Sequence, residues 1–307
     1  MGMDTRINEA VEEIGTVLLG KEQQIRLALC CLFSKGHLLI EDLPGMGKTT
    51  LSHALAFVFR LDYKRVQFTS DLLPADVLGY SIYDKTTSQF KFHPGPVFTQ
   101  VLLADEINRT TPKSQSALLE AMAEGQVTIE GETRALQSPF FVIATQNPVN
   151  QSGTYPLPES QLDRFLMRIE LGYPDPAAER RLYMGVDSQE QLAKLSQKLN
   201  TDDLNEIYAA AAAIKTSDAL LDYVQRLVEY SRTAEEFAYG LSPRGALALL
   251  RAARTWALME GRSHVVPEDL QAVLPAVCGH RFRAAAHFQG DSNALVHQLL
   301  HQVPVIA

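Results

Sequence analysis

A glycine-rich stretch that ends in a lysine and two threonines, residues 45–50, carries the side chains that phosphate binding requires. Gly45 and Gly47 allow the backbone to adopt positive φ angles and to approach an anion closely. An apolar run precedes the stretch and apolar residues at helical spacing follow it, so a helix N-terminus is expected beside the loop. Lys48 is expected to reach the β- and γ-phosphates of a nucleotide, and the Thr49 hydroxyl to hold Mg²⁺. The sequence therefore predicts a strand, a phosphate-binding loop and a helix.

The loop departs at one position from the usual pattern, G-x-x-x-x-G-K-[ST], because the first glycine of that pattern falls on Asp42. Gly45 can supply the flexibility nearer the tip of the loop. From the loop alone, a glycine-rich turn with a chance lysine stays open as the alternative. The residues expected to bind the nucleotide are consecutive: Pro44, Gly45, Met46, Gly47, Lys48, Thr49 and Thr50.

Two carboxylates, Asp105 and Glu106, come at the end of an apolar run that begins at residue 101. Such a run is typical of a buried parallel strand, and α/β sheets place their ligands at the C-terminal ends of strands. Asp105 is expected to hold Mg²⁺, directly or through water, as the second metal residue beside Thr49. Glu106 is expected to orient and deprotonate an attacking water. The alternative is an acidic N-cap for the helix expected near residues 114–124.

A further apolar run, residues 140–145, ends in Gln146, Asn147 and Pro148. A polar amide at a strand end beside the phosphates can position the water or sense the γ-phosphate, which makes Asn147 a candidate catalytic residue. The alternative is a turn formed by the Asn-Pro pair.

The other elements follow from hydrophobic periodicity and from turn residues. Before residue 173, the predicted elements are two helices within 4–35, strands at 63–68 and 166–171, hairpins at 80–92 and 126–136, and a short helix at 157–165. Beyond it the pattern predicts only helices, at 176–185, 188–199, 202–214, 217–230, 242–260 and 267–275. A Gly- and Pro-rich segment separates the two parts, so the predicted domains are an α/β nucleotide-binding domain at 1–173 and a helical domain at 174–307.

Composition sets outer limits on function. The 307 residues carry a formal net charge of −8, so global attraction to nucleic acid is not indicated. Cys30, Cys31 and Cys278 fit neither a zinc pattern nor a disulfide framework and are expected to be buried. No apolar run is long enough to span a bilayer and no signal-peptide pattern is present, which leaves the cytoplasm as the expected location.

Several motifs together resemble the MoxR family of AAA+ ATPases. They are the loop at 43–49, the run at 102–109, the segments at 115–122, 126–129 and 144–148, and the stretch at 157–165. The resemblance extends from about residue 5 to the helix that begins near Ser242 and Pro243, and the family has acidic residues at the Asp42 position. It implies an α/β core with strand order 5-1-4-3-2, an all-helical lid and a hexameric ring. It also implies that residues 72–96 hold the helix-2 insert and that 126–136 form the hairpin before sensor 1.

The resemblance also assigns roles by position. Lys48 and Thr49 match Walker A, Asp105 and Glu106 match Walker B, Asn147 matches sensor 1, Arg164 the arginine finger and Arg244 sensor 2. Arg244 comes directly after Ser242 and Pro243, which indicate the start of a helix. Arg109 and Arg168 are placed near the expected subunit edge, and a surface ion pair is an equal alternative for both.

The leading hypothesis is therefore a Mg²⁺-dependent ATPase that remodels protein partners. Family members resemble chaperones that mature client enzymes or insert metals and cofactors, often beside proteins with a von Willebrand factor A domain. A nucleic-acid motor is the first rival, but its hairpins would need basic tips, and residues 84–88 and 130–132 are mixed or acidic. A slow nucleotide-gated switch is the second rival, and an intact Asp105–Glu106 pair argues against it.

Overall fold

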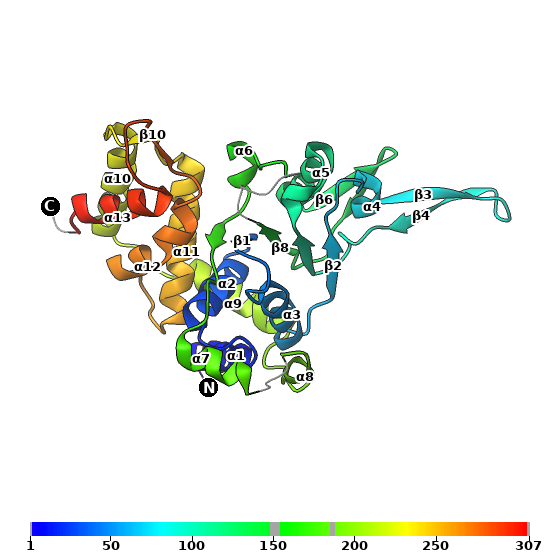
Figure 1. Cartoon of the computed structure of the whole chain (residues 1–307), viewed down its shortest axis with the longest axis horizontal. Helices are drawn as coiled ribbons and strands as arrows, with labels where there is room; N and C mark the ends of the chain where they lie inside the picture. The colour runs from blue at the N-terminus through cyan, green and yellow to red at the C-terminus, as the bar shows by residue number, and fades with distance from the viewer. Residues whose placement is uncertain (1, 148–153, 185–187, 306–307) are drawn as a thin grey trace.

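The computed structural model describes residues 2–147, 154–184 and 188–305 (Figure 1). Its centre is a parallel five-stranded sheet with the order β2-β5-β8-β1-β9. The strands are β1 (Leu38–Glu41), β2 (Tyr63–Gln67), β5 (Val101–Asp105), β8 (Phe141–Gln146) and β9 (Met167–Ile169). Counted along the chain without the hairpin strands, this order is 5-1-4-3-2, which confirms the prediction.

The central strands are buried on both faces because their side chains are almost all apolar. Successive side chains point to opposite faces, so Leu38 and Ile40 of β1 enter one core and Leu39 enters a second. The helices over the first core are α1 (Met3–Gly15), α2 (Glu22–Phe33) and α3 (Lys48–Val58). The second core lies under α5 (Pro112–Glu124). Both faces are covered, and the C-terminal strand ends form the accessible rim of the sheet.

Two antiparallel hairpins flank this core, as predicted. β3 (Gly79–Asp84) pairs with β4 (Gln89–Pro94), and β6 (Gln126–Ile129) pairs with β7 (Glu132–Ala135). The first hairpin follows the short helix α4 (Pro74–Leu78) and extends far from the body of the molecule on the β2 side (Figure 1).

Two glycines at the base of the first hairpin allow its two backbone segments to approach each other closely. Gly79 has φ 103°, and a Cβ on either Gly79 or Gly95 would collide with neighbouring backbone atoms. Farther along, the Arg134 guanidinium of β7 lies 4.1 Å from the Phe92 ring centroid of β4, so the second hairpin braces the first.

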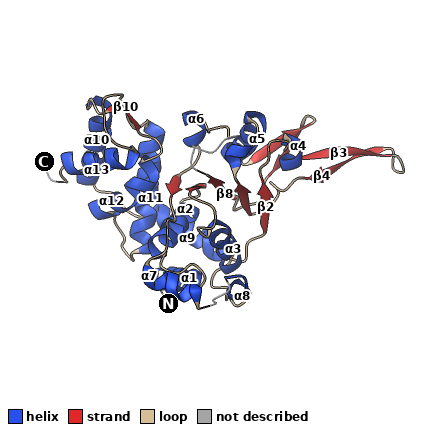
Figure 2. Cartoon of the chain, in the orientation of Figure 1, coloured by secondary structure: helices blue, strands red, loops and turns tan. Residues whose placement is uncertain are grey.

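The chain beyond β9 is mainly helical (Figure 2). The helices are α7 (Pro176–Tyr183), α8 (Ser188–Leu192), α9 (Thr201–Ala213), α10 (Asp218–Thr233), α11 (Pro243–Met259), α12 (Pro267–Cys278) and α13 (Ser292–Gln302). The expectation that this part contains helices only was wrong in one detail: β10 (Phe237–Tyr239) and β11 (Arg283–Ala284) form an antiparallel pair. Strands of three and two residues are too short to show a period of two, which explains why the pattern missed them.

The helix predicted at 188–199 is also shorter than expected. It ends at Leu192, and the following chain packs against the end of α3, where the N–H groups of Lys198 and Leu199 donate to Val58 O over 3.0 and 3.2 Å. In a longer helix these two N–H groups would have donated to carbonyl groups of the same helix, and here a carbonyl group of α3 accepts them instead.

One hydrophobic core runs through both parts of the chain. It joins side chains of α1, α2 and α3 to those of α9, α11 and α12, and α11 packs on α1, α2 and α9. The boundary at residue 173 therefore does not separate two cores, and the division into 1–173 and 174–307 stays a prediction. Within the described ranges, none of the helices has both the length and the apolar character needed to cross a bilayer.

Candidate active site

The turn between β1 and α3 forms the predicted phosphate-binding loop. Gly45 has φ 85°, and Gly47 has φ 92° and is the N-cap of α3, which begins at Lys48. A Cβ at position 47 would lie 2.8 Å from Leu18 Cδ1, a flexible side-chain end that can move aside, so the positive φ angle is the main reason for glycine there. The first N–H groups of α3 and the positive end of its dipole meet at this loop, which is the arrangement that binds an anion.

Asp42, at the position where the usual pattern has glycine, anchors the loop. Its carboxylate accepts the N–H of Leu43 over 2.8 Å and that of Gly172 over 2.6 Å. The aspartate that replaces the usual glycine therefore connects the start of the loop to the chain that follows β9 through these hydrogen bonds.

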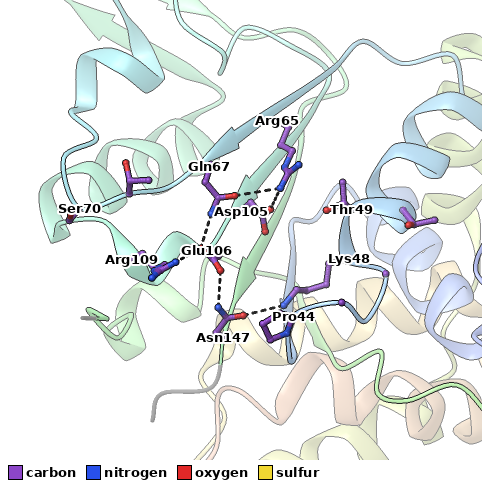
Figure 3. A pocket seen from close by; sticks show the side chains of 14 residues that line it. Pro44, Lys48, Thr49, Arg65, Gln67, Ser70, Asp105, Glu106, Arg109 and Asn147 are labelled. Carbon is purple, nitrogen blue, oxygen red and sulfur yellow. Dashed lines mark hydrogen bonds and ion pairs between the residues drawn. The ribbon is translucent and has the colours of Figure 1, made fainter. Parts of the chain in front are cut away.

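Lys48 is the first residue of α3, and its side chain reaches back over the loop toward Asn147 (Figure 3). Its Nζ atom donates to the backbone oxygens of Asp42 (2.6 Å) and Leu43 (3.3 Å) and to Asn147 Oδ1 (3.4 Å), and the residue is only 8% exposed. Burial lowers the pKa of Lys48, an effect opposed by the carboxylates of Asp42, Asp105 and Glu106. These hydrogen-bond partners are neutral oxygens, so the ammonium charge is available to an anionic ligand.

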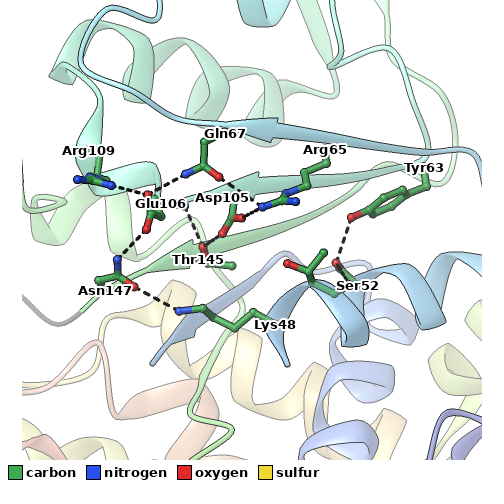
Figure 4. Close-up of polar contacts among 11 residues, drawn as sticks. Lys48, Ser52, Tyr63, Arg65, Gln67, Asp105, Glu106, Arg109, Thr145 and Asn147 are labelled. Atoms are coloured by element: carbon green, nitrogen blue, oxygen red, sulfur yellow. Dashed lines mark hydrogen bonds and ion pairs between the residues drawn. The ribbon is translucent and has the colours of Figure 1, made fainter. Parts of the chain in front are cut away.

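Asp105 is held by side chains from the two strands beside β5 (Figure 4). Its Oδ2 atom accepts from the Arg65 guanidinium of β2 over 2.7 Å, and its Oδ1 atom accepts from Thr145 Oγ1 of β8 over 2.6 Å. Thr145 Oγ1 in turn accepts the N–H of Glu106 over 2.9 Å. One buried hydroxyl therefore fixes both carboxylate residues at the rim of the sheet.

Glu106 has a left-handed backbone conformation, with φ 55° and ψ 48°. Non-glycine residues adopt this region at a cost of about 1–2 kcal/mol. Glu106 Oε2 accepts from Gln67 Nε2 (2.8 Å) and Arg109 NH1 (2.9 Å), and Oε1 accepts from Asn147 Nδ2 (2.9 Å). The alternative of an acidic cap is not observed, because the N-cap of α5 is Thr111.

A cavity of about 970 Å³, called the main cavity below, lies over these groups. Its lining joins the loop to three strand ends: Pro44, Gly45, Gly47, Lys48, Thr49, Thr50, Arg65, Gln67, Thr69, Ser70, Asp105, Glu106, Arg109 and Asn147. Of the predicted nucleotide-binding residues only Met46 is not in this lining, since its side chain packs against the first core.

Comparison with known proteins identifies the family of this chain. Residues 37–167 match the model of the ATPase family associated with various cellular activities (AAA), and 229–299 match the AAA lid domain. "Uncharacterized protein YeaC" of Bacillus subtilis is 43% identical, with 97% of this chain and 94% of that protein covered. "Chaperone MoxR1" of Mycobacterium tuberculosis is 42% identical, with 90% and 75% covered. The crystal structure of a "putative ATPase" from Cytophaga hutchinsonii superposes with TM-score 0.87 at 36% identity, covering 98% of this chain and 95% of that one.

The chain belongs to the MoxR family of AAA+ ATPases. Its activity is accordingly ATP hydrolysis, and the main cavity contains most of the residues that the sequence predicts for it. The residues gathered there from distant parts of the chain are Lys48, Thr49, Asp105, Glu106 and Asn147. The Pro148 of the predicted Asn-Pro turn lies outside the described residues.

The other two candidate residues of this MoxR-family chain, Arg164 and Arg244, lie elsewhere. Both line a second cavity of about 420 Å³ between α5, α11 and the turn before β9, called the cationic cavity below. Arg164 NH1 donates to Leu119 O over 2.7 Å, and Arg244 Nε lies 3.7 Å from Asp163 Oδ2. Neither residue lines the main cavity of its own chain, and their roles stay predictions.

Sequence reasoning missed five polar residues in or beside the main cavity: Arg65, Gln67, Thr69, Ser70 and Thr145. Arg65 and Gln67 lie two residues apart at the end of an edge strand, a spacing that places both on one face, and Thr145 is the residue before the last in a buried strand. Of the two arginines left open, Arg109 lines the main cavity and bonds Glu106, whereas Arg168 bonds Glu41 Oε2 over 3.1 Å and Ser292 Oγ over 3.0 Å.

The residues present suit a nucleotide with one Mg²⁺ ion. Thr49 and Asp105 both line the main cavity, and Mg²⁺ usually takes one or two protein oxygens and completes its shell with phosphate and water. Among the described residues no cluster of three or more His, Cys, Asp or Glu side chains could hold a metal by itself. A hard cation that depends on substrate phosphates fits this donor set better than a resident metal does.

Proposed function

We propose that the chain hydrolyses ATP in the main cavity in a Mg²⁺-dependent reaction and uses the energy to remodel protein clients. The observation that carries the proposal is the hydrogen-bonded series from Lys48 through Asn147 to Glu106, which lies beside the Asp105 carboxylate. A phosphate binder, a polar amide and a candidate general base thus meet at one rim of the sheet.

Each residue of the series has a role in this mechanism. Lys48 and the loop N–H groups bind the β- and γ-phosphates, and Asn147 orients the attacking water beside Glu106. The water attacks the γ-phosphorus, its proton passes to a Glu106 carboxylate oxygen, and the bond from the γ-phosphorus to the β–γ bridging oxygen breaks, giving ADP and inorganic phosphate. Mg²⁺ held by Thr49 and Asp105 would neutralise charge on the phosphates.

The proposal includes a homo-oligomeric ring, expected to be a hexamer, in which Arg164 completes the site of the next subunit. The support is the position of Arg164, which lines the cationic cavity near the start of β1, whereas the main cavity lies beyond the end of that strand. Sedimentation with and without ATP tests the assembly, and a monomer at all concentrations would exclude the ring.

The client is expected to be a protein that needs maturation, including insertion of a metal or cofactor, with a von Willebrand factor A domain protein as partner. The similarity to "Chaperone MoxR1" supports a chaperone-like role. The first hairpin offers apolar surface for protein contacts, since Tyr83 and Phe90 are 49% and 72% exposed and their ring centroids are 5.3 Å apart. The cytoplasmic location stays a prediction.

Purified protein tested for phosphate release separates this proposal from its rivals. We expect activity that requires Mg²⁺, that is abolished by a chelator and that does not respond to DNA. Stimulation by DNA would favour a nucleic-acid motor, and tight ATP binding without turnover would favour a nucleotide-gated switch. A response to the partner protein that disappears in Phe90→Ser but survives in the exposed-residue control Thr87→Ala would support the hairpin as contact surface.

A further inference from the structure

A buried arginine just beyond α12 holds the turn that carries Arg164. The Arg281 side chain is only 6% exposed. Its Nε atom donates to Asp163 Oδ1 over 2.7 Å, NH2 donates to Phe165 O over 2.8 Å and to Asp163 O over 3.3 Å, and NH1 donates to Leu166 O over 3.1 Å. A guanidinium presents its donors in one rigid plane, so these contacts define the orientation of the turn as well as its position.

The carbonyl groups of the turn need partners from other parts of the chain. The helix α6 (Glu159–Leu162) has Asp163 as its C-cap, so the carbonyl groups of residues 163–166 lie at or beyond the helix end, where no intrahelical partner is available. On the α/β side the turn is attached through Leu166 N, which donates to His37 O over 2.9 Å, and through the Arg164 side chain itself. Arg281 supplies partners to three of the four carbonyl groups of residues 163–166.

A second arginine of the helical part reaches the same carboxylate. Asp163 Oδ2 lies 3.7 Å from Arg244 Nε of α11, while Asp163 Oδ1 accepts from Arg281. One carboxylate therefore joins the start of α11 to the chain beyond α12 at the residue next to Arg164. A displacement of α11 and α12 relative to the sheet would reach this turn through these contacts.

We propose that Arg281 is a positioning residue, which fixes the Arg164 turn to the helical part of the chain so that the lid sets where Arg164 lies. The inference rests on the proposed function, in which Arg164 acts at the ATP of the neighbouring subunit. The inference adds Arg281 as the residue through which a change of lid position in one subunit moves Arg164, and so affects the active site of the next subunit. A purely structural role would instead lower stability and affect the subunit's own ATP binding.

The first test is Arg281→Lys, which keeps the charge and loses the forked donors. We expect kcat to fall about 10²-fold, the effect of a small misplacement of a catalytic group. KM for ATP should stay within about twofold, because the loop of the variant is intact. The matched control is Arg283→Lys, two residues away, whose exposed side chain pairs with Glu159 of α6 over 2.8 Å and whose change should leave kcat as in the wild type.

The second test distinguishes positioning from a merely structural role. If Arg281 acts through Arg164, then adding Arg281→Lys to Arg164→Ala lowers kcat no further, whereas an independent structural effect adds to it. Mixed with Lys48→Ala protein, the Arg281→Lys variant should regain part of the activity, since its own phosphate loop can accept an intact arginine. Mixed with Arg164→Ala protein, it should regain none.

The outcomes separate this inference from the function on which it rests. Wild-type protein without ATPase activity, or Arg164→Ala with full activity, overturns the proposed function and the inference with it. An impaired Arg164→Ala beside a fully active Arg281→Lys overturns the positioning role alone. Should Arg281→Lys fail to fold, Asp163→Asn tests the same contact: a loss of about tenfold in kcat that vanishes in the Arg164→Ala background supports the role, and an unchanged kcat overturns it.

Discussion

Asn147 Nδ2 donates to Glu106 Oε1 over 2.9 Å, and this bond joins the ends of two neighbouring strands. The other end of the amide, Asn147 Oδ1, accepts from Lys48 Nζ over 3.4 Å. An amide has one donating and one accepting end, so its orientation is determined by an ammonium on one side and a carboxylate on the other. Phosphate that draws Lys48 away would thus also change the surroundings of Glu106.

Replacement of Glu106 by Gln should nearly abolish hydrolysis while ATP binding persists. A carboxamide cannot accept the proton of water, and general-base catalysis contributes typically about 10²–10⁴-fold. Nucleotide titration and steady-state phosphate release measure the two effects. Glu120→Gln, at an exposed position of α5, is the matched control, and near-normal turnover of the Glu106 variant would exclude Glu106 as the base.

The Lys48→Ala variant should lose ATP affinity and not only rate. The ammonium contacts phosphate in the ground state as well as in the transition state, so its removal weakens both. Calorimetric titration with a non-hydrolysable analogue measures this, with Lys64→Ala of β2 as the exposed control. Unchanged affinity would show that the lysine does not contact the phosphates.

Thr145→Val should lower both stability and turnover. The valine keeps the shape of the buried threonine but leaves the Glu106 N–H and the Asp105 carboxylate without the bridging hydroxyl. An unsatisfied buried donor costs about 1–3 kcal/mol, which urea unfolding detects. The exposed Thr128→Val of the second hairpin controls for the substitution itself, and equal stability of the two variants would contradict the bridging role.

Arg164→Ala should be inactive alone and partly active when mixed with Lys48→Ala protein. A mixed ring contains interfaces at which an intact loop faces an intact arginine, and an arginine supplied in trans contributes about 10³–10⁵-fold. Specific activity should also rise with protein concentration. Normal hydrolysis by Arg164→Ala alone would show that the arginine acts neither in cis nor in trans.

Arg244→Ala should reduce turnover and leave the fold intact. Its side chain is 64% exposed, and its 3.7 Å contact with Asp163 is weak, so stability should change by less than about 1 kcal/mol. If Arg244 couples lid position to the nucleotide, small-angle scattering of the variant should lose its difference between ATP and ADP states. Persistence of that difference would refute the coupling.

The sequence predicted those parts of the site that consist of local patterns. Lys48 and Thr49 follow a glycine-rich turn, and Asp105 and Glu106 follow an apolar strand, so each pair is recognisable within about ten residues. The strand order was predicted from the family resemblance, and the sheet confirms it.

The parts that it could not predict depend on contacts between distant residues. Arg65 and Asp105 are 40 residues apart, and Arg281 and Asp163 are 118 apart. Neither arginine stands in a motif, and each acquires its partner only when the chain folds. β10 and β11 illustrate the same limit, since strands of three and two residues take their conformation from each other.

The two glycines at the base of the first hairpin make that hairpin an exchangeable module. Gly79 and Gly95 fix how the ribbon leaves the domain, because a side chain on either would collide with backbone. Beyond them, most side chains of β3 and β4 are exposed or only partly buried, so their replacement alters the contact surface with little effect on the folding of the core. If the hairpin contacts clients as proposed, exchanging it between homologues should change which client is bound and leave the residues of the main cavity unchanged.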